Sequence, residues 1–95
     1  MSKKIVVISA VWCPSCLILN KQLKQIKENY KDLEIIKLDY DFDEELVEKY
    51  NVGKKLPVII LEDDNQEIRR LTGEKEYSEI TSFIEGDLVW KRKYY

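Results

Sequence analysis

The sequence contains no histidine, only two cysteines, three glycines and two prolines. Without histidine, the chain itself cannot supply a histidine general base, a cysteine–histidine nucleophilic pair or a histidine metal ligand. The scarcity of glycine and proline indicates few long loops. Hydrophobic residues make up 44% of the chain and charged residues 36%, which predicts a single folded domain over residues 1–95.

Other absences disfavour whole classes of protein. The formal net charge is −2, so the basic surface of a nucleic-acid-binding protein is not expected. No apolar run approaches the ~20 residues of a membrane-spanning helix. The start, "MSKKIVVISAVW", mimics a secretory signal, but its apolar part is short and no small-residue cleavage site follows. Since two cysteines are also too few for a secreted disulfide framework, we expect a cytoplasmic protein that binds neither nucleic acid nor membrane.

The first half of the chain alternates strand and helix patterns. Residues 4–9 are β-branched and almost all apolar, as in a central strand buried on both faces. From residue 14 to about 29 the apolar positions recur at helical spacing; they are Cys16, Leu19, Leu23, Ile26 and Tyr30. Residues 33–40 predict a second strand. We expect Asp41 to cap the next helix, with Glu44 completing a capping box, and Asn51 to end it in the left-handed conformation.

The second half predicts a hairpin and a final helix. Residues 56–62 and 67–72 have strand character and are separated by a turn too short for anything but antiparallel pairing. Gly73 then breaks the chain, and Tyr77, Ile80, Ile84 and Leu88 mark the buried side of the last helix. Because the two earlier crossovers favour parallel pairing, the order β-α-β-α-β-β-α predicts an α/β fold. Its four-stranded mixed sheet carries helices on both faces.

Both cysteines lie within "VISAVWCPSC", residues 7–16, where the first strand gives way to the first helix. Pro14 suits the first helical position, so Cys13 falls at the mouth of the helix. There a thiolate faces free backbone N–H groups and the positive end of the helix dipole, and both favour the anion. Cys16 lies one turn further on, in the apolar stripe, where burial keeps a thiol protonated. We therefore expect an exposed nucleophile at Cys13 and a shielded thiol at Cys16.

This inequality suits thiol–disulfide exchange, but three other uses of the pair remain open. A zinc site needs four ligands, so carboxylates or a second subunit would have to complete it. A structural disulfide would close a loop too short to constrain the unfolded chain much. Two thiolates can also bind Cu(I), because soft ligands suit that ion.

At "WCPSC" the chain resembles thioredoxin-like proteins, in which Trp-Cys-x-x-Cys opens a helix after a strand. Two further segments are similar to that family. Residues 37–41, "KLDYD", look like the end of the following strand, and residues 50–61, "YNVGKKLPVIIL", look like the segment that leads into a cis-proline and the next strand. The resemblance covers roughly residues 4–90, and the combination is more specific than an isolated Cys-x-x-Cys.

The resemblance implies a role for each residue around the cysteines. Cys13 attacks a substrate disulfide and Cys16 resolves the mixed disulfide, with Pro14 and Ser15 tuning the pair. Pro57 follows a cis bond, and the backbone of Leu56 pairs with the substrate chain. Trp12 lines the substrate groove, unless it packs in the core. Lys37 either lies beneath the active site or faces water at a strand edge.

The sequence also departs from the family pattern. It begins directly with the cysteine-bearing strand, without the preceding strand and helix of full-length thioredoxins. Pro14 follows the first cysteine as in glutaredoxins, but the Gly-Gly-Asp-type element that holds glutathione there is not found in "TGEKEY". Val7 stands where thioredoxins bury an aspartate that accepts a proton from the second cysteine. The acidic residues 39–45 and the basic residues 90–95 are expected to be solvated.

The function implied by the resemblance is reduction of protein disulfides by a monomeric thiol–disulfide oxidoreductase. The Cys13–Cys16 dithiol itself carries the electrons, so no bound cofactor or metal is expected. Its partners are oxidised proteins and either a thioredoxin reductase or glutathione upstream. The alternatives are a glutathione-dependent glutaredoxin and a Cys-x-x-Cys metal-binding module.

Overall fold

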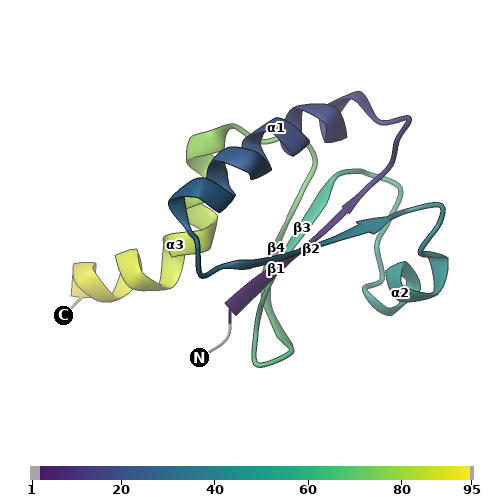
Figure 1. The fold of residues 1–95 in the computed structure, drawn as a ribbon. Coiled ribbons are helices and arrows are strands. Elements are labelled where there is room, and N and C mark those ends of the chain that lie inside the picture. Colours follow the sequence, from purple (N-terminus) through teal and green to yellow (C-terminus); the bar gives the residue numbers. More distant parts are fainter. Residues whose placement is uncertain (1–2, 95) are drawn as a thin grey trace.

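The computed structural model describes the backbone of residues 3–94 and the side chains of residues 3–85. The elements follow the predicted order (Figure 1) and are β1 Lys3–Ser9, α1 Pro14–Asn29, β2 Glu34–Asp39, α2 Glu44–Lys49, β3 Val58–Asp63, β4 Gln66–Thr72 and α3 Tyr77–Tyr94. Leu88 and the basic segment 90–95 lie outside the residues whose side chains are described. Within the described part of the chain, no helix is both long and apolar enough to cross a membrane.

The four strands form one mixed sheet in the order β2-β1-β3-β4. β1 pairs parallel with β2 and antiparallel with β3, and β3 pairs antiparallel with β4. As a result, the carboxyl ends of β1, β2 and β4 and the amino end of β3 meet at the same end of the sheet. The loops that follow or precede these strand ends therefore gather around the start of α1 (Figure 1).

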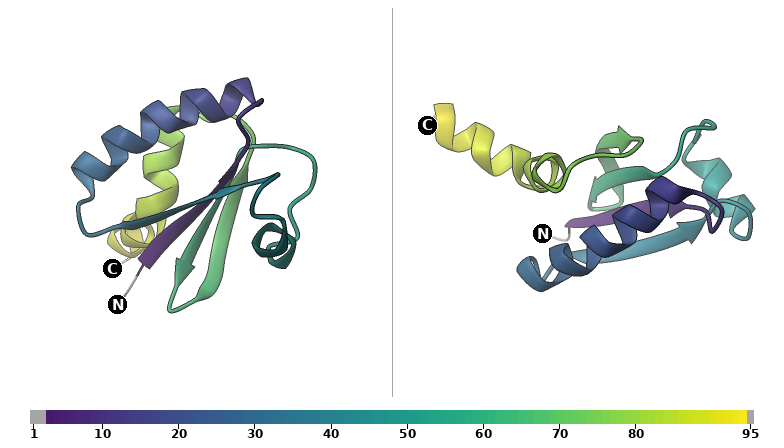
Figure 2. Two further views of the ribbon diagram at one scale, coloured as in Figure 1. Left: turned by 45° about the vertical axis from the view of Figure 1, so that its right-hand side comes forward. Right: turned by 90° about the horizontal axis from the view of Figure 1, so that it is seen from above.

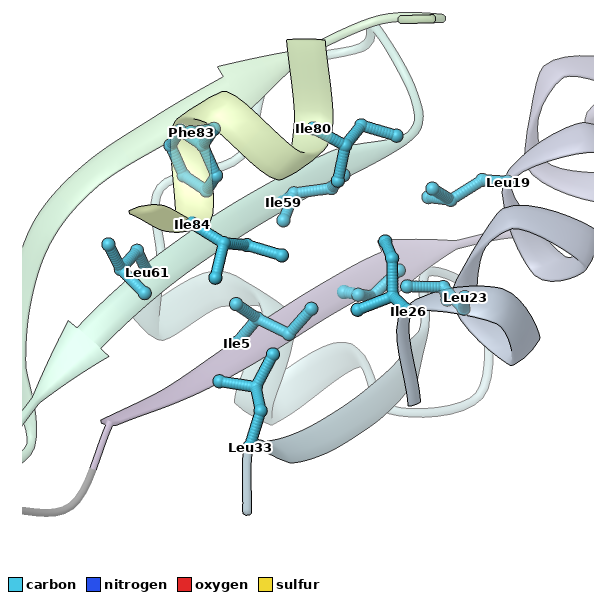
Figure 3. Close-up of a cluster of buried hydrophobic side chains, with 11 residues drawn as sticks. Ile5, Leu19, Leu23, Ile26, Leu33, Ile59, Leu61, Ile80, Phe83 and Ile84 are labelled. Carbon is cyan, nitrogen blue, oxygen red and sulfur yellow. The ribbon is translucent and has the colours of Figure 1, made fainter. Parts of the chain in front are cut away.

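Both faces of the central strand β1 are buried, as its sequence predicted. Ile5 and Val7 point into a core shared with α1 and α3, which lie on one side of the sheet (Figure 2). Val6 and Ile8 point into a second core, on the side of α2. Figure 3 shows the first core, in which α1 contributes Leu19, Leu23 and Ile26, and α3 contributes Ile80, Phe83 and Ile84.

The predicted hairpin is confirmed, and so are the predicted end of the helix at Asn51 and the predicted break in the chain at Gly73. The turn between β3 and β4 holds Asp64 and Asn65 at φ 53° and 66°, the left-handed pair that matches the twist of a two-residue hairpin. Asn51 ends α2 at φ 51°, and Gly73 follows β4 at φ 92°. An L side chain at Gly73 would be strained in that conformation, which explains the glycine.

The predicted cap of α2 is wrong. The helix begins at Glu44, and Asp43 occupies the N-cap position without capping it through its side chain. The Asp43 carboxylate instead accepts a hydrogen bond from the Asp39 amide at 2.7 Å. Asp39 in turn accepts from the amides of Asp41 and Phe42 at 2.8 and 3.0 Å. Because Asp39 and Asp43 close this turn between them, the side chain of Asp41 points elsewhere.

Two isoleucines of α1 test how much the buried side of this helix stabilises the fold. Ile26 is fully buried in the first core, whereas Ile18 on the same helix is 45% exposed. We expect Ile26→Ala to lower the free energy of unfolding by about 2–5 kcal/mol, because it leaves a cavity between α1, α3 and the sheet. Ile18→Ala should change it by less than about 0.5 kcal/mol. Urea denaturation of both variants measures the difference, and equal losses would contradict this packing.

Candidate active site

The two cysteines lie where α1 begins, at the end of the sheet where the four strand ends meet. Cys13 occupies the N-cap position with extended backbone angles, φ −96° and ψ 112°, and Pro14 is the first helical residue. The Cys13 sulfur accepts a hydrogen bond from the Cys16 backbone N–H at 3.3 Å. The predicted position at the helix mouth is therefore observed, and the sulfur itself serves as the helix cap. A thiolate there is stabilised by this N–H and by the helix dipole.

The expected exposure of Cys13 is wrong. Its residue exposure is 5%, against 1% for Cys16, and both are free thiols. Both belong to the core on the α2 side, which also contains Ala10, Leu56 and Val58. The reason is that residues from the segments at this end of the sheet pack against Cys13 and leave little of it accessible. An incoming disulfide must fit against these loops to meet the sulfur.

The two thiols still differ in their electrostatics. Burial raises the pKa of the Cys16 thiol to about 12, and its hydrogen bond to the Cys13 sulfur acts in the same direction. A backbone hydrogen bond involving Ala10 opposes these effects only in part. Cys16 therefore remains protonated at neutral pH, while the Cys13 sulfur accepts a hydrogen bond from the first turn of the helix.

Pro57 follows a cis peptide bond after Leu56, as the resemblance implied. Pro57 is fully buried, and the nearly buried Leu56 belongs to the same core as the sulfurs. The Pro57 carbonyl accepts a hydrogen bond from the Gly73 amide at 2.8 Å. This bond joins the segment before β3 to the loop after β4, and the two together form one side of the site.

Trp12 lies on the surface and not in the core. It is 60% exposed, and its indole Nε1–H donates a hydrogen bond to Asp41 Oδ2 at 2.7 Å. The loops that follow β1 and β2 are further joined by a bond from the Tyr40 amide to the Ser9 carbonyl at 2.7 Å. The indole is thus held in a fixed position beside Cys13, with much of its apolar surface open to a partner.

Ser15 contacts a residue that the sequence analysis missed. Its hydroxyl donates a hydrogen bond to Glu74 Oε1 at 2.9 Å. The loop that carries Glu74 is also fixed to α1 by a bond from Gln22 Nε2 to the Lys75 carbonyl at 3.0 Å. Ser15 and Glu74 are 59 positions apart, so no local pattern links them.

Val7 and Lys37 are partners in the β1–β2 ladder. Val7 is fully buried in the first core, so this position supplies no proton acceptor. Lys37 is exposed on the edge strand, in a surface groove whose other residues are Leu23, Lys24, Lys27 and Ile35. The structure therefore places Lys37 at the strand edge beside α1.

The donor groups of the site are two sulfurs. Among the residues that the structure describes, no group of three or more histidine, cysteine, aspartate or glutamate side chains is placed to hold a metal ion. Chemically, the arrangement offers a sulfur nucleophile at a helix terminus and a second thiol one turn deeper. Such a pair can attack a disulfide and then resolve the product.

Comparisons with known proteins agree with this arrangement. The family model described as "Thioredoxin" matches residues 1–86. The chain is 30% identical over 85 residues to the chloroplastic thioredoxin F2 of Arabidopsis thaliana, with 87% of this chain and 45% of that protein covered. It is 29% identical over 77 residues to thioredoxin H2 of the same plant, with 79% and 57% covered. The chain thus spans about half the length of these relatives.

A solved structure shows the same fold. The oxidised mitochondrial thioredoxin 3 of Saccharomyces cerevisiae superposes with a TM-score of 0.81 at 22% identity, and the match covers 90% of this chain and 78% of that one. At this level of identity the likeness concerns the fold alone.

The raised pKa of Cys16 predicts how this thiol reacts with iodoacetamide. In the Cys13→Ser variant, which retains only Cys16, we expect alkylation of the folded protein at pH 8 to be at least about a hundredfold slower than in urea, because thiolate is the reacting form. The native rate should keep rising with pH beyond 10, since burial persists without Cys13. Intact-mass measurements at intervals follow the reaction. A native rate that levels off near pH 9 would show an ordinary thiol.

Proposed function

The chain belongs to the thioredoxin family, and from this premise we propose that it reduces protein disulfides through Cys13 and Cys16. The observation that supports this most directly is the hydrogen bond from the Cys16 amide to the Cys13 sulfur. It stabilises negative charge on the sulfur nearer the surface, while burial keeps the deeper thiol protonated. A nucleophile and a protected resolving thiol are the two parts that the exchange needs.

In the first step the Cys13 thiolate attacks one sulfur of the substrate disulfide. A new S–S bond joins Cys13 to that sulfur, the substrate S–S bond breaks, and the released sulfur takes a proton from water. In the second step Cys16 loses its proton and attacks the Cys13 sulfur. The second substrate thiol leaves, and the protein ends as the Cys13–Cys16 disulfide after giving two electrons to the substrate.

The proton of Cys16 has no carboxylate acceptor at Val7, so water receives it in the proposed mechanism. Burial that raises the pKa of Cys16 makes this proton costly to remove in the resting protein. The cost falls once Cys13 is in a mixed disulfide, since its sulfur then has no negative charge to repel a second thiolate.

We propose that substrate chains lie against Trp12 on one side and Leu56–Pro57 on the other. The exposed indole offers a flat apolar contact. The backbone of Leu56 precedes β3 at the end of the sheet that holds the cysteines, where an extended chain can pair with it. The dithiol needs no bound cofactor. The proposed partners are oxidised proteins and a reductase upstream, and the proposed state is a cytoplasmic monomer.

Serine substitutions of each cysteine test the proposed roles. Cys13→Ser should lower reduction of a protein disulfide such as that of insulin by about a hundredfold or more, because the nucleophile is lost. The variant should remain folded, since serine is itself a good N-cap. Cys16→Ser should instead accumulate a mixed disulfide with the substrate, detectable as an added mass. Undiminished reduction by folded Cys13→Ser would contradict catalysis.

The upstream electron donor is tested by two coupled assays with the same substrate. We expect turnover with NADPH and thioredoxin reductase, and little with glutathione and glutathione reductase, because the Gly-Gly-Asp-type element of glutaredoxins is not found before α3. Turnover with glutathione alone would assign the chain to the glutathione-dependent alternative. Native mass spectrometry of the reduced protein serves as the control for the metal-binding alternative, which requires stoichiometric zinc or copper.

A further inference from the structure

Two carboxylates flank the dithiol, and each is held by a residue next to a cysteine. Asp41 Oδ2 accepts a hydrogen bond from Trp12, which precedes Cys13. Glu74 Oε1 accepts one from Ser15, which lies between the cysteines. Asp41 follows β2 and Glu74 follows β4, the two edge strands of the sheet. The negative charges therefore border the site from opposite edges.

A positive charge lies close to Glu74. A Cβ atom built on Gly73 would come within 3.1 Å of Lys55 Cε and 3.7 Å of Lys55 Nζ. The ammonium group of Lys55 thus lies beside Gly73, the residue that precedes Glu74. The rim of the site holds charges of both signs, each in a defined place.

The position of Glu74 is fixed by contacts on both sides. Its carboxylate is bonded to Ser15, and the next residue of its loop is bonded to Gln22 through the Lys75 carbonyl. Because Ser15 lies between the two cysteines in the sequence, its hydrogen bond brings this carboxylate near the dithiol. Within a Debye length, about 10 Å at 0.1 M salt, charges influence one another.

Building on the proposed exchange reaction, we propose that Glu74 is a specificity-determining residue of this site. Its carboxylate disfavours disulfides that carry negative charge next to the sulfurs and favours those flanked by positive charge. On a protein substrate, the preferred disulfide is one with lysine or arginine beside the cysteine that Cys13 attacks. Asp41, at the other edge of the sheet, also disfavours negatively charged disulfides. The positive charge of Lys55 opposes the effect of both carboxylates.

The test compares oxidised glutathione, which is an anion at neutral pH, with cystamine, which is a dication. Each oxidises the reduced protein by the same two-step exchange, in which the dithiol gives two electrons and the disulfide becomes two thiols. Rates are measured at low ionic strength by intact-mass analysis of acid-quenched samples. Glu74→Gln is the informative variant, because the glutamine oxygen can still accept the Ser15 hydrogen bond while the charge is lost.

We expect Glu74→Gln to raise the ratio of the glutathione rate to the cystamine rate by about three- to tenfold. The increase should largely disappear in 1 M salt, where charges are screened within about 3 Å. Lys55→Gln should move the ratio in the opposite direction. Glu34→Gln removes the same charge at the start of β2, at the opposite end of the sheet, and should leave the ratio unchanged.

The possible outcomes are distinct. An unchanged ratio in Glu74→Gln, with both disulfides still reacting, overturns the role of Glu74 and leaves the proposed function intact. Equal slowing of both reactions shows that Glu74 acts only on the structure of the site, which also overturns the proposal. If the unmodified protein reacts with neither disulfide, the proposed function itself fails and the specificity role fails with it.

Discussion

Burial of β1 on both faces is the constraint on which the rest of the structure depends. Successive side chains of β1 point into two separate cores. A shift of the strand by one residue would therefore move every side chain into the opposite core. The strand is thereby fixed in register, and so is the point at which it ends. Because α1 begins only a few residues later, the same constraint places Cys13 at the end of the sheet where the other loops gather.

The site is assembled by contacts between loops that are distant in the sequence. The indole of Trp12 joins the loop after β2, the hydroxyl of Ser15 joins the loop after β4, and the Pro57 carbonyl joins that loop to the segment before β3. Each strand contributes one loop, and each loop is tied to another by a hydrogen bond. This arrangement explains how the Cys13 sulfur can be almost buried and yet lie beside polar groups that face the solvent.

The sequence predicted those features that depend on local patterns. The buried stripe of α1, the two-sided burial of β1 and the left-handed Asn51 follow from spacing or from the properties of single residues. The cap of α2 was predicted wrongly because three aspartates lie within five residues. Which of them occupies the N-cap position depends on the hydrogen bonds that they make with the turn before the helix. The hydrogen bonds of Asp41 to Trp12 and of Glu74 to Ser15 span 29 and 59 positions, which no local pattern encodes. The burial of Cys13 likewise depends on residues distant in the sequence, among them Leu56 and Val58.

The sulfur of Cys13 caps α1, and in the proposed exchange it is also the nucleophile, so the stability of the helix and the proposed reactivity depend on the same atom. A stronger hydrogen bond to this sulfur increases the fraction present as thiolate. It also weakens each thiolate as a nucleophile, because intrinsic nucleophilicity falls with basicity, with a Brønsted coefficient of about 0.4–0.5. Because a thiolate accepts this hydrogen bond more strongly than a disulfide sulfur does, the same bond also favours the reduced dithiol over the Cys13–Cys16 disulfide. Selection for a more stable helix at this position is therefore also selection for a more readily reduced disulfide.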